Sequence, residues 1–148
     1  MNIKDLSEKT VDFIVKRVAE IIGLFLACIS ILLFLSFVSY SPEDPNFIFS
    51  ENREINNILG FRGSYTSDFF FQSIGLISFL IPFTIFFTGI SLIKNKKFLI
   101  IIESIFYSIL YSVIGSLFFT VFYPNSFWLT INGSGGFVGE FLQKTVLF

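Results

Sequence analysis

Residues 21–40 read IIGLFLACISILLFLSFVSY, a stretch that contains no charged side chain. An α-helix of about 20 apolar residues is long enough to cross the hydrocarbon core of a bilayer. Two further stretches, 69–93 and 98–122, are similarly apolar, and Glu103 is the one acid that lies well inside them. The pattern predicts an all-α membrane protein, a bundle with three complete transmembrane helices at about these positions.

The composition of the whole chain supports a membrane location and excludes several kinds of active site. Its 148 residues include 23 phenylalanines but only 10 Lys and Arg and 11 Asp and Glu, so that 14% are charged. In soluble domains, charged residues make up roughly a quarter of the chain on average. Histidine is absent, Cys28 is the single cysteine, and no GxxxxGK[ST] nucleotide loop occurs. We therefore expect no catalytic residue, cofactor-binding residue or metal ligand. The net charge of −1 predicts no direct nucleic-acid binding.

The segments between the apolar stretches indicate how the chain is oriented. Residues 1–20 combine apolar positions at helical spacing with charges, which predicts an amphipathic helix at the membrane surface that runs into the first span. Lys and Arg number four in this segment and three in the 94–97 linker, but two in the 41–68 loop and none in 124–136. Because cytoplasmic segments are enriched in Lys and Arg, the N-terminus and the 94–97 linker are predicted to be cytoplasmic.

The C-terminal residues 137–148 are too few to cross a bilayer, and they permit two interpretations. They could form an amphipathic helix on the outer surface, or they could belong to a fourth span that is cut short. We favour the second interpretation. The chain then divides into a cytoplasmic helix at 1–20 and a membrane domain at 21–148, whose fourth span, at 135–148, is truncated.

A stripe of small polar residues marks one face of the third span. Four serines recur at intervals of four residues, which keeps them close to one helical face. They are Ser104, Ser108, Ser112 and Ser116. Small residues let membrane helices approach closely, so we interpret the stripe as a helix-packing surface. The alternative is a polar conduit in a small multi-pass transporter or channel, in which the intramembrane Glu103 would be a proton or cation site.

The position of Glu103 favours an interfacial role over transport. It lies five residues after Phe98, roughly 8 Å into the predicted span. At this shallow depth the carboxylate can reach the cytoplasmic interface. Lys96, seven residues earlier on the same helical face, can pair with it or with lipid headgroups.

Three short motifs follow one another at the ends of the predicted spans. They are SYSPEDPNF at 39–47, NILGFRGSYTSD at 57–68 and GGFVG at 135–139. In this order they resemble the SYSPxDPSF motif, the N–x–x–G–x–x–G stretch ending in Asp, and the GGxxG helix entry of the FtsK/SpoIIIE family of DNA translocases. The principal matching positions are Ser39, Tyr40, Ser41, Pro42, Asp44, Pro45, Gly60, Gly63, Asp68, Gly135, Gly136 and Gly139.

The resemblance implies an N-terminal four-helix membrane region, which favours the truncated fourth span. It also implies an anchor in the bacterial inner membrane at the division septum. In that family a motor that uses ATP and Mg moves DNA during cell division and chromosome segregation. The motor is absent from this chain, and no position here matches the motor's nucleotide or DNA residues. The partners implied are the lipid bilayer, other cell-division membrane proteins and further copies of the chain in a homo-oligomer.

Overall fold

A computed structural model of the chain describes residues 3–45, 54–126, 128–129 and 131–146, with side chains from residue 7 onward. The helices are α1 (Ile3–Val38), α2 (Gly60–Ile74), the 3₁₀ helix η1 (Gly75–Phe79), α3 (Leu80–Asn95), α4 (Leu99–Phe122) and α5 (Gly136–Val146). No strand occurs among the described residues. Three helical stretches are long and apolar enough to cross a membrane, Ser7–Val38, Gly60–Asn95 and Leu99–Phe122. This confirms the predicted all-α membrane fold. Asn46 and Phe47, at the end of the first motif, lie outside the described residues.

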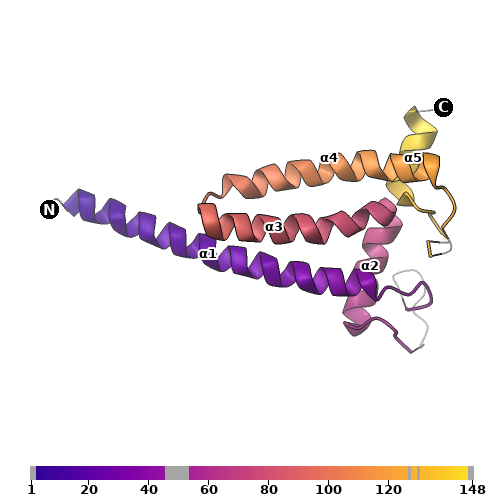
Figure 1. Cartoon of the computed structure of the whole chain (residues 1–148), viewed down its shortest axis with the longest axis horizontal. Coiled ribbons are helices and arrows are strands. Elements are labelled where there is room, and N and C mark those ends of the chain that lie inside the picture. The colour runs from indigo at the N-terminus through magenta and orange to yellow at the C-terminus, as the bar shows by residue number, and fades with distance from the viewer. Residues whose placement is uncertain (1–2, 46–53, 127, 130, 147–148) are drawn as a thin grey trace.

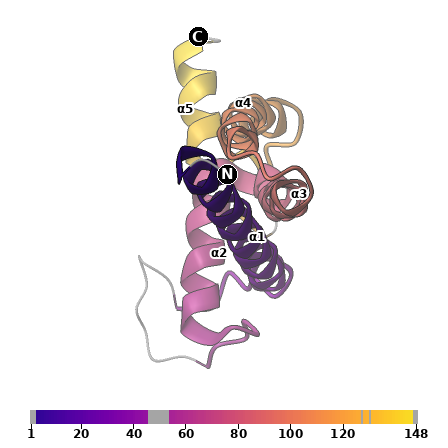
Figure 2. The same cartoon turned by 90° about the vertical axis from the view of Figure 1, so that its left-hand side faces the viewer.

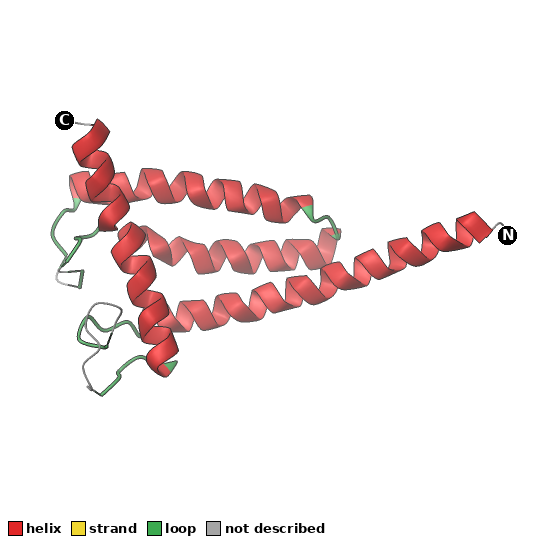
Figure 3. Cartoon of the chain, turned by 180° about the vertical axis from the view of Figure 1, so that it is seen from behind, coloured by secondary structure: helices red, strands yellow, loops and turns green. Residues whose placement is uncertain are grey.

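The helices form two groups that run in different directions. Helices α1, α3 and α4 lie side by side along the long axis of the molecule, with α3 between the other two (Figure 1). Helices α2 and α5 run crosswise, at the end of the bundle where α1 and α4 finish and α3 begins (Figures 2 and 3). We call α2 and α5 the crossbar. With the predicted cytoplasmic N-terminus, the crossbar belongs to the outer side of the membrane.

Helix α1 is longer than a membrane span and extends beyond the other helices on the N-terminal side (Figure 1). Its 36 residues correspond to about 54 Å, against about 30 Å for the hydrocarbon core. The sequence predicted an amphipathic helix over 1–20 that runs into the first span. The structure shows one helix from Ile3 to Val38, because no Gly or Pro interrupts the segment before Gly23 and pairs such as Lys16–Asp12 (2.6 Å) support the helix. The position of this segment at the membrane surface stays a prediction.

The second apolar stretch is not one helix. The sequence predicted a single helix over 69–93, whereas the structure changes direction at Gly75, between α2 and α3. Gly75 has a φ of 72°, a conformation that other residues rarely adopt. Pro82 in the first turn of α3 lacks the N–H that would bond to the Ser78 carbonyl, so an unbroken α-helix would be interrupted there in any case. The Ser78 hydroxyl donates to the Phe70 carbonyl across the break (2.9 Å).

Helices α1 and α3 approach each other closely at a pair of glycines. A Cβ atom added to Gly89 would lie 2.5 Å from the carbonyl oxygen of Gly23, and one added to Gly23 would lie 2.6 Å from the carbonyl oxygen of Gly89. Neighbouring Ala27 is also small, and its backbone nitrogen is 3.0 Å from the Gly89 Cβ position. Close approach of backbones over small residues is a main source of helix association in membranes, so this contact holds α1 to α3.

The predicted hairpin between the second and third spans is confirmed. Helix α3 ends at Asn95 and α4 begins at Leu99, and the two helices run antiparallel. Lys96 ends α3 in the left-handed conformation, with its N–H donating to the Leu92 carbonyl at 2.8 Å. The Lys96 ammonium pairs with Glu20 of α1 at 2.7 Å, which ties the hairpin to α1 on the predicted cytoplasmic side.

Helix α5 begins beside the predicted start of the fourth helix but lies crosswise at the end of α4 (Figure 1). Phe137 and Phe141 are exposed, with their rings stacked 6.2 Å apart, while Glu140 pairs with Lys144 at 2.6 Å. The helix at 136–146 is compatible with both interpretations that the sequence offered. A fourth span at 135–148 stays a prediction.

The glycine contact predicts the effect of filling it. Gly89→Leu places side-chain atoms where the backbone of α1 lies, and overpacking of this kind lowers the free energy of unfolding by about 1–3 kcal/mol. Unfolding of the purified chain by SDS in mixed micelles measures the loss. The control is Ile90→Leu, at a side chain that is 42% exposed. Equal stability of the two variants would show that the glycine contact does not hold α1 to α3.

Candidate functional site

The motif residues of the first loop and of α2 lie together where α1 ends and α2 begins. They join the last turn of α1, the turn at 41–45 and the first half of α2 through hydrogen bonds. We call this set the outer clasp. It consists of Ser36, Ser39, Tyr40, Ser41, Asp44, Pro45, Asn57, Gly63, Ser64 and Asp68.

Asn57 closes the C-terminal end of α1. Its side-chain amide donates to the carbonyl oxygens of Ser36 (2.9 Å) and Ser39 (3.3 Å). The last carbonyls of a helix have no partner within the helix and need one from elsewhere. The Asn57 side-chain oxygen accepts from the N–H of Leu59 at 3.1 Å, immediately before α2. One buried side chain therefore serves the end of α1 and the start of α2.

Asp44 holds the segment that leads into α2. Its two carboxylate oxygens accept hydrogen bonds from the backbone N–H groups of Asn56 and Asn57, both at 2.9 Å. The carboxylate reaches them because Pro42 lies in a turn that is closed by a bond from the N–H of Asp44 to the Ser41 carbonyl at 3.2 Å. Asp44 is only 3% exposed, so the acid after the first span has a structural role in this geometry.

Gly63 and the serines around it allow α2 to lie directly on the end of α1. The Ser36 hydroxyl donates to the Gly63 carbonyl at 2.7 Å, and the Ser64 hydroxyl donates to the Pro45 carbonyl at 2.7 Å. A Cβ atom on Gly63 would lie 2.0 Å from the side-chain oxygen of Asn57. Any larger residue at position 63 would therefore displace Asn57.

Tyr40 and Asp68 form the part of the outer clasp nearest to the centre of the crossbar. The Tyr40 hydroxyl donates to Asp68 Oδ1 at 3.1 Å, and the Gln72 amide donates to the same oxygen at 3.3 Å. Burial and then the negative charge of Asp68 raise the pKa of Tyr40 above its ordinary value, so the hydroxyl keeps its proton. The Tyr40 ring lies against Phe71, with centroids 4.8 Å apart, in the apolar cluster around Phe37.

The glycine motif at the start of α5 lies across η1 and α4. We call this contact the second crossing, the first being the contact of α2 with the end of α1. The Leu76 N–H donates to the Ser134 carbonyl at 2.8 Å. A Cβ on Gly75 would lie 2.0 Å from the same oxygen, and one on Gly136 would lie 2.5 Å from the Gly75 nitrogen. Gly75 and Gly136 both have positive φ, 72° and 66°. At Gly75 and Gly136 the two backbones therefore lie too close together to leave room for a side chain.

Ser116 joins this second crossing to the serine stripe. Its hydroxyl donates to the Ile74 carbonyl at 2.9 Å, and it is fully buried. Cβ atoms on Gly135 and Gly139 would lie 2.3 and 2.4 Å from the Ser116 carbonyl oxygen. The GGxxG spacing thus places two glycines over the same peptide group of α4. Asn132 adds hydrogen bonds to the carbonyl and side-chain oxygens of Gln72 at 3.2 and 3.1 Å.

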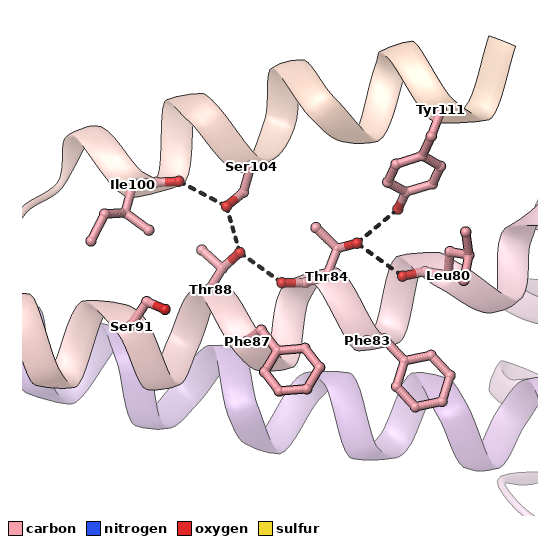
Figure 4. Close-up of a pocket in the computed structure, with 9 residues that line it drawn as sticks. All are labelled: Leu80, Phe83, Thr84, Phe87, Thr88, Ser91, Ile100, Ser104 and Tyr111. Carbon is pink, nitrogen blue, oxygen red and sulfur yellow. Dashed lines mark hydrogen bonds between the residues drawn. The ribbon is translucent and has the colours of Figure 1, made fainter. Parts of the chain in front are cut away.

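At the other end of the stripe, Ser104 faces a cleft of about 410 Å³ between α3 and α4. Its hydroxyl donates to the Ile100 carbonyl at 2.8 Å and accepts from Thr88 at 2.6 Å (Figure 4). Thr84 and Tyr111 share a hydrogen bond of 3.0 Å in the same cleft. Ser108 and Ser112, between the two ends, are half-buried. In the cleft, the hydroxyls of Thr84, Thr88, Ser104 and Tyr111 are therefore bonded to one another or to backbone carbonyls.

Glu103 is not part of this cleft. Its side chain is exposed, and it is absent from the residues that line the cleft. The pairing of Lys96 with Glu103 that the sequence suggested is replaced by the ion pair of Lys96 with Glu20. The arrangement gives no support to the transporter alternative. Among the described residues, every buried side-chain nitrogen and oxygen has a hydrogen-bond partner, and no group of three or more His, Cys, Asp or Glu could hold a metal ion.

Comparison with known proteins identifies the family. A family model described as "4TM region of DNA translocase FtsK/SpoIIIE" matches residues 15–147, which include most of α1 and all of α2 to α5. The chain belongs to this family. The match covers the membrane region of such translocases and not the motor.

Several proteins named DNA translocase FtsK are similar to the chain. The protein of Rickettsia bellii is 43% identical over 72 residues, 48% of the chain and 9% of that protein. The protein of Rickettsia prowazekii is 36% identical over 61 residues, 41% of the chain and 8% of that protein. The protein of Bradyrhizobium diazoefficiens is 27% identical over 129 residues, 87% of the chain. The chain spans 16% of that relative's length. No solved structure matches the chain.

Some residues of the FtsK 4TM site could not be named from the sequence. Ser36 lies outside the three motifs, Ser64 lies within the second motif but at none of its matching positions, and Gln72 and Asn132 are 60 residues apart. The available signal was weak: each is a polar residue next to or within an apolar helix, where an unbonded polar group is costly. Their partners depend on how α2 folds back over α1, and the sequence does not contain that information in a local pattern.

The Asp44 contacts predict a stability loss. Asp44→Ala leaves the N–H groups of Asn56 and Asn57 without their acceptor, and each buried unpaired donor costs about 1–3 kcal/mol. The free energy of unfolding in detergent, followed by tyrosine fluorescence, should fall accordingly. Glu43→Ala, at the exposed neighbouring acid, is the matched control and should leave it unchanged. Equal values for the two variants would contradict the structural role of Asp44.

The second crossing predicts a difference between two glycines with the same backbone conformation. Gly60 and Gly75 have φ of 63° and 72°, but a Cβ on Gly60 would meet no atom within 4 Å. Gly60→Ala should lower the free energy of unfolding by only about 1 kcal/mol, because alanine is disfavoured in the left-handed conformation. Gly75→Ala should cost more, because its Cβ would displace Ser134 and separate α5 from η1. The test is unfolding in SDS micelles together with protease cleavage in 124–135; equal behaviour of the two variants would refute the crossing.

Proposed function

We propose that this chain anchors a DNA translocase in the bacterial inner membrane at the division septum, where it takes part in cell division and chromosome segregation. The observation that carries the proposal is the family match over 15–147. The relatives bear the name DNA translocase FtsK, and the chain corresponds to a small part of their length. ATP, Mg and DNA belong, in this proposal, to a motor outside the segment, and this chain contributes no catalytic step and no nucleic-acid contact.

The described contacts support a passive, holding mechanism. Hydrogen bonds join the polar groups within the outer clasp, and others join Thr84 to Tyr111 and Thr88 to Ser104 within the α3–α4 cleft. No buried side-chain nitrogen or oxygen is unpaired among the described residues. A network that is fully satisfied in this way makes a membrane domain rigid, but it does not react. A rigid anchor confines the attached protein to the membrane surface and so raises its local concentration there.

Helix α4 is the surface that we propose for contacts with other division proteins or with a second copy of the chain. Only Ser116 of its 24 residues is buried, although most residues of the helix are apolar. Phe106 and Ile109 are 63% and 61% exposed. Part of this surface faces lipid, and part is free to pack against a partner's membrane helix.

Localisation tests the proposed function. A fluorescent fusion of the chain should be enriched at the septum of dividing cells. The variant Phe106→Ala/Ile109→Ala should stay in the membrane but lose part of this enrichment, whereas Ile21→Ala/Leu24→Ala, at exposed positions of α1, should keep it. Uniform membrane fluorescence of the unmodified chain in dividing cells would overturn the proposal. Full enrichment of the α4 variant would exclude α4 as the contact surface.

A further inference from the structure

A groove beneath α2 combines an apolar wall with an arginine at its edge. The groove has a volume of about 360 Å³ and is lined on the α1 side by Ile29, Leu32 and Leu33. On the α2 side it is lined by Leu59, Arg62 and Thr66. It lies on a different face of α1 from the Gly23 contact with α3.

The position of this groove matches the outer boundary of the membrane. Arg62 precedes Gly63, whose carbonyl bonds to Ser36 in the last turn of α1, whereas Ile29 lies seven residues before Ser36, about 10 Å deeper along the helix axis. The upper end of the groove therefore lies at headgroup level and its lower end in the hydrocarbon. Leu32 and Ile29 are 50% and 36% exposed, so the groove is open to the surrounding lipid.

Arg62 has no counter-charge within the described part of the chain. No hydrogen bond or ion pair of its guanidinium to another described residue occurs, although its backbone carbonyl accepts from Thr66 at 2.7 Å. The nearest buried acid of α2, Asp68, is already bonded to Tyr40 and Gln72. A guanidinium that lines an apolar groove at a membrane surface is complementary to a phosphate, which it can bind through two parallel hydrogen bonds.

The groove is also held open before anything binds. The Ser36 hydroxyl bonds to the Gly63 carbonyl at 2.7 Å and fixes α2 over α1 at this point. Because both walls are positioned by the outer clasp, a ligand would not have to order them, and binding would lose little affinity to rearrangement.

We propose that this groove binds one phospholipid of the outer leaflet. The phosphate pairs with the Arg62 guanidinium, and one acyl chain lies along Leu33, Leu32 and Ile29. A partner's membrane helix fits less well, because such helices associate through apolar and small side chains and would leave the Arg62 charge unpaired. The chemistry of both ends, an anion at the interface and an alkyl chain below it, selects a phospholipid.

Native mass spectrometry of the full chain with added phosphatidylglycerol tests the proposal. The unmodified chain should retain one lipid under conditions that remove the others. Arg62→Gln should weaken retention about tenfold, as expected for loss of a hydrogen-bonded charge pair. Leu32→Trp, which fills the groove and leaves Arg62 in place, should also release the lipid.

Two controls distinguish lipid binding in this groove from non-specific attraction of lipid to the chain. Lys144→Gln removes another cation of the crossbar, whose side chain is 72% exposed, and Leu24→Trp adds the same bulk at a position of α1 away from the groove. Both should retain the lipid as the unmodified chain does. Equal retention by Arg62→Gln and Lys144→Gln, or by Leu32→Trp and Leu24→Trp, would overturn the proposal. Retention of a partner membrane protein with no lipid would do so as well.

Discussion

The carbonyl groups at the C-terminal end of α1 need hydrogen-bond partners, and the residues that follow α1 supply them. A helix that stops at a membrane boundary leaves carbonyl groups without partners, and unpaired peptide groups are costly where water is scarce. Asn57 bonds the carbonyls of Ser36 and Ser39, and it can do so only if the chain returns over the top of α1. Asp44 fixes that return by holding the N–H groups of Asn56 and Asn57. The direction of α2 follows from this bond set.

The second crossing depends on the first. Because α2 runs across the end of α1, it reaches η1 at the height where α4 finishes, and Gly75 then meets the 134–136 backbone. Ser116 bonds the carbonyl of Ile74 and lies under the two glycines of α5. Motif residues that are far apart in the chain thus belong to one connected structure. The contacts described for these motif residues are structural ones.

The sequence predicted the number of apolar spans and the family, because apolar runs and motif spacing are local features. It also identified SYSPEDP and the glycine motif as important without revealing their partners. It did not predict the break at Gly75, since an apolar run of 69–93 has the same composition whether it is straight or bent. It predicted that the amphipathic segment at 1–20 runs into the first span, but not the direction of that segment, because amphipathic spacing is the same for a surface helix and a projecting one. The pairing of Lys96 with Glu20 joins two spans that no local pattern connects.

The unbroken length of α1 has a mechanical consequence. Its outer end is gripped by the outer clasp, its middle is braced by Gly89 and by the Lys96–Glu20 pair, and its N-terminal part extends past every other helix. A helix held at its outer end and near its middle has a fixed direction, so the outer clasp and the brace at Gly89 together determine where the N-terminal part of α1 projects. The outer clasp and the N-terminal end of α1 are separated by about 54 Å of continuous helix.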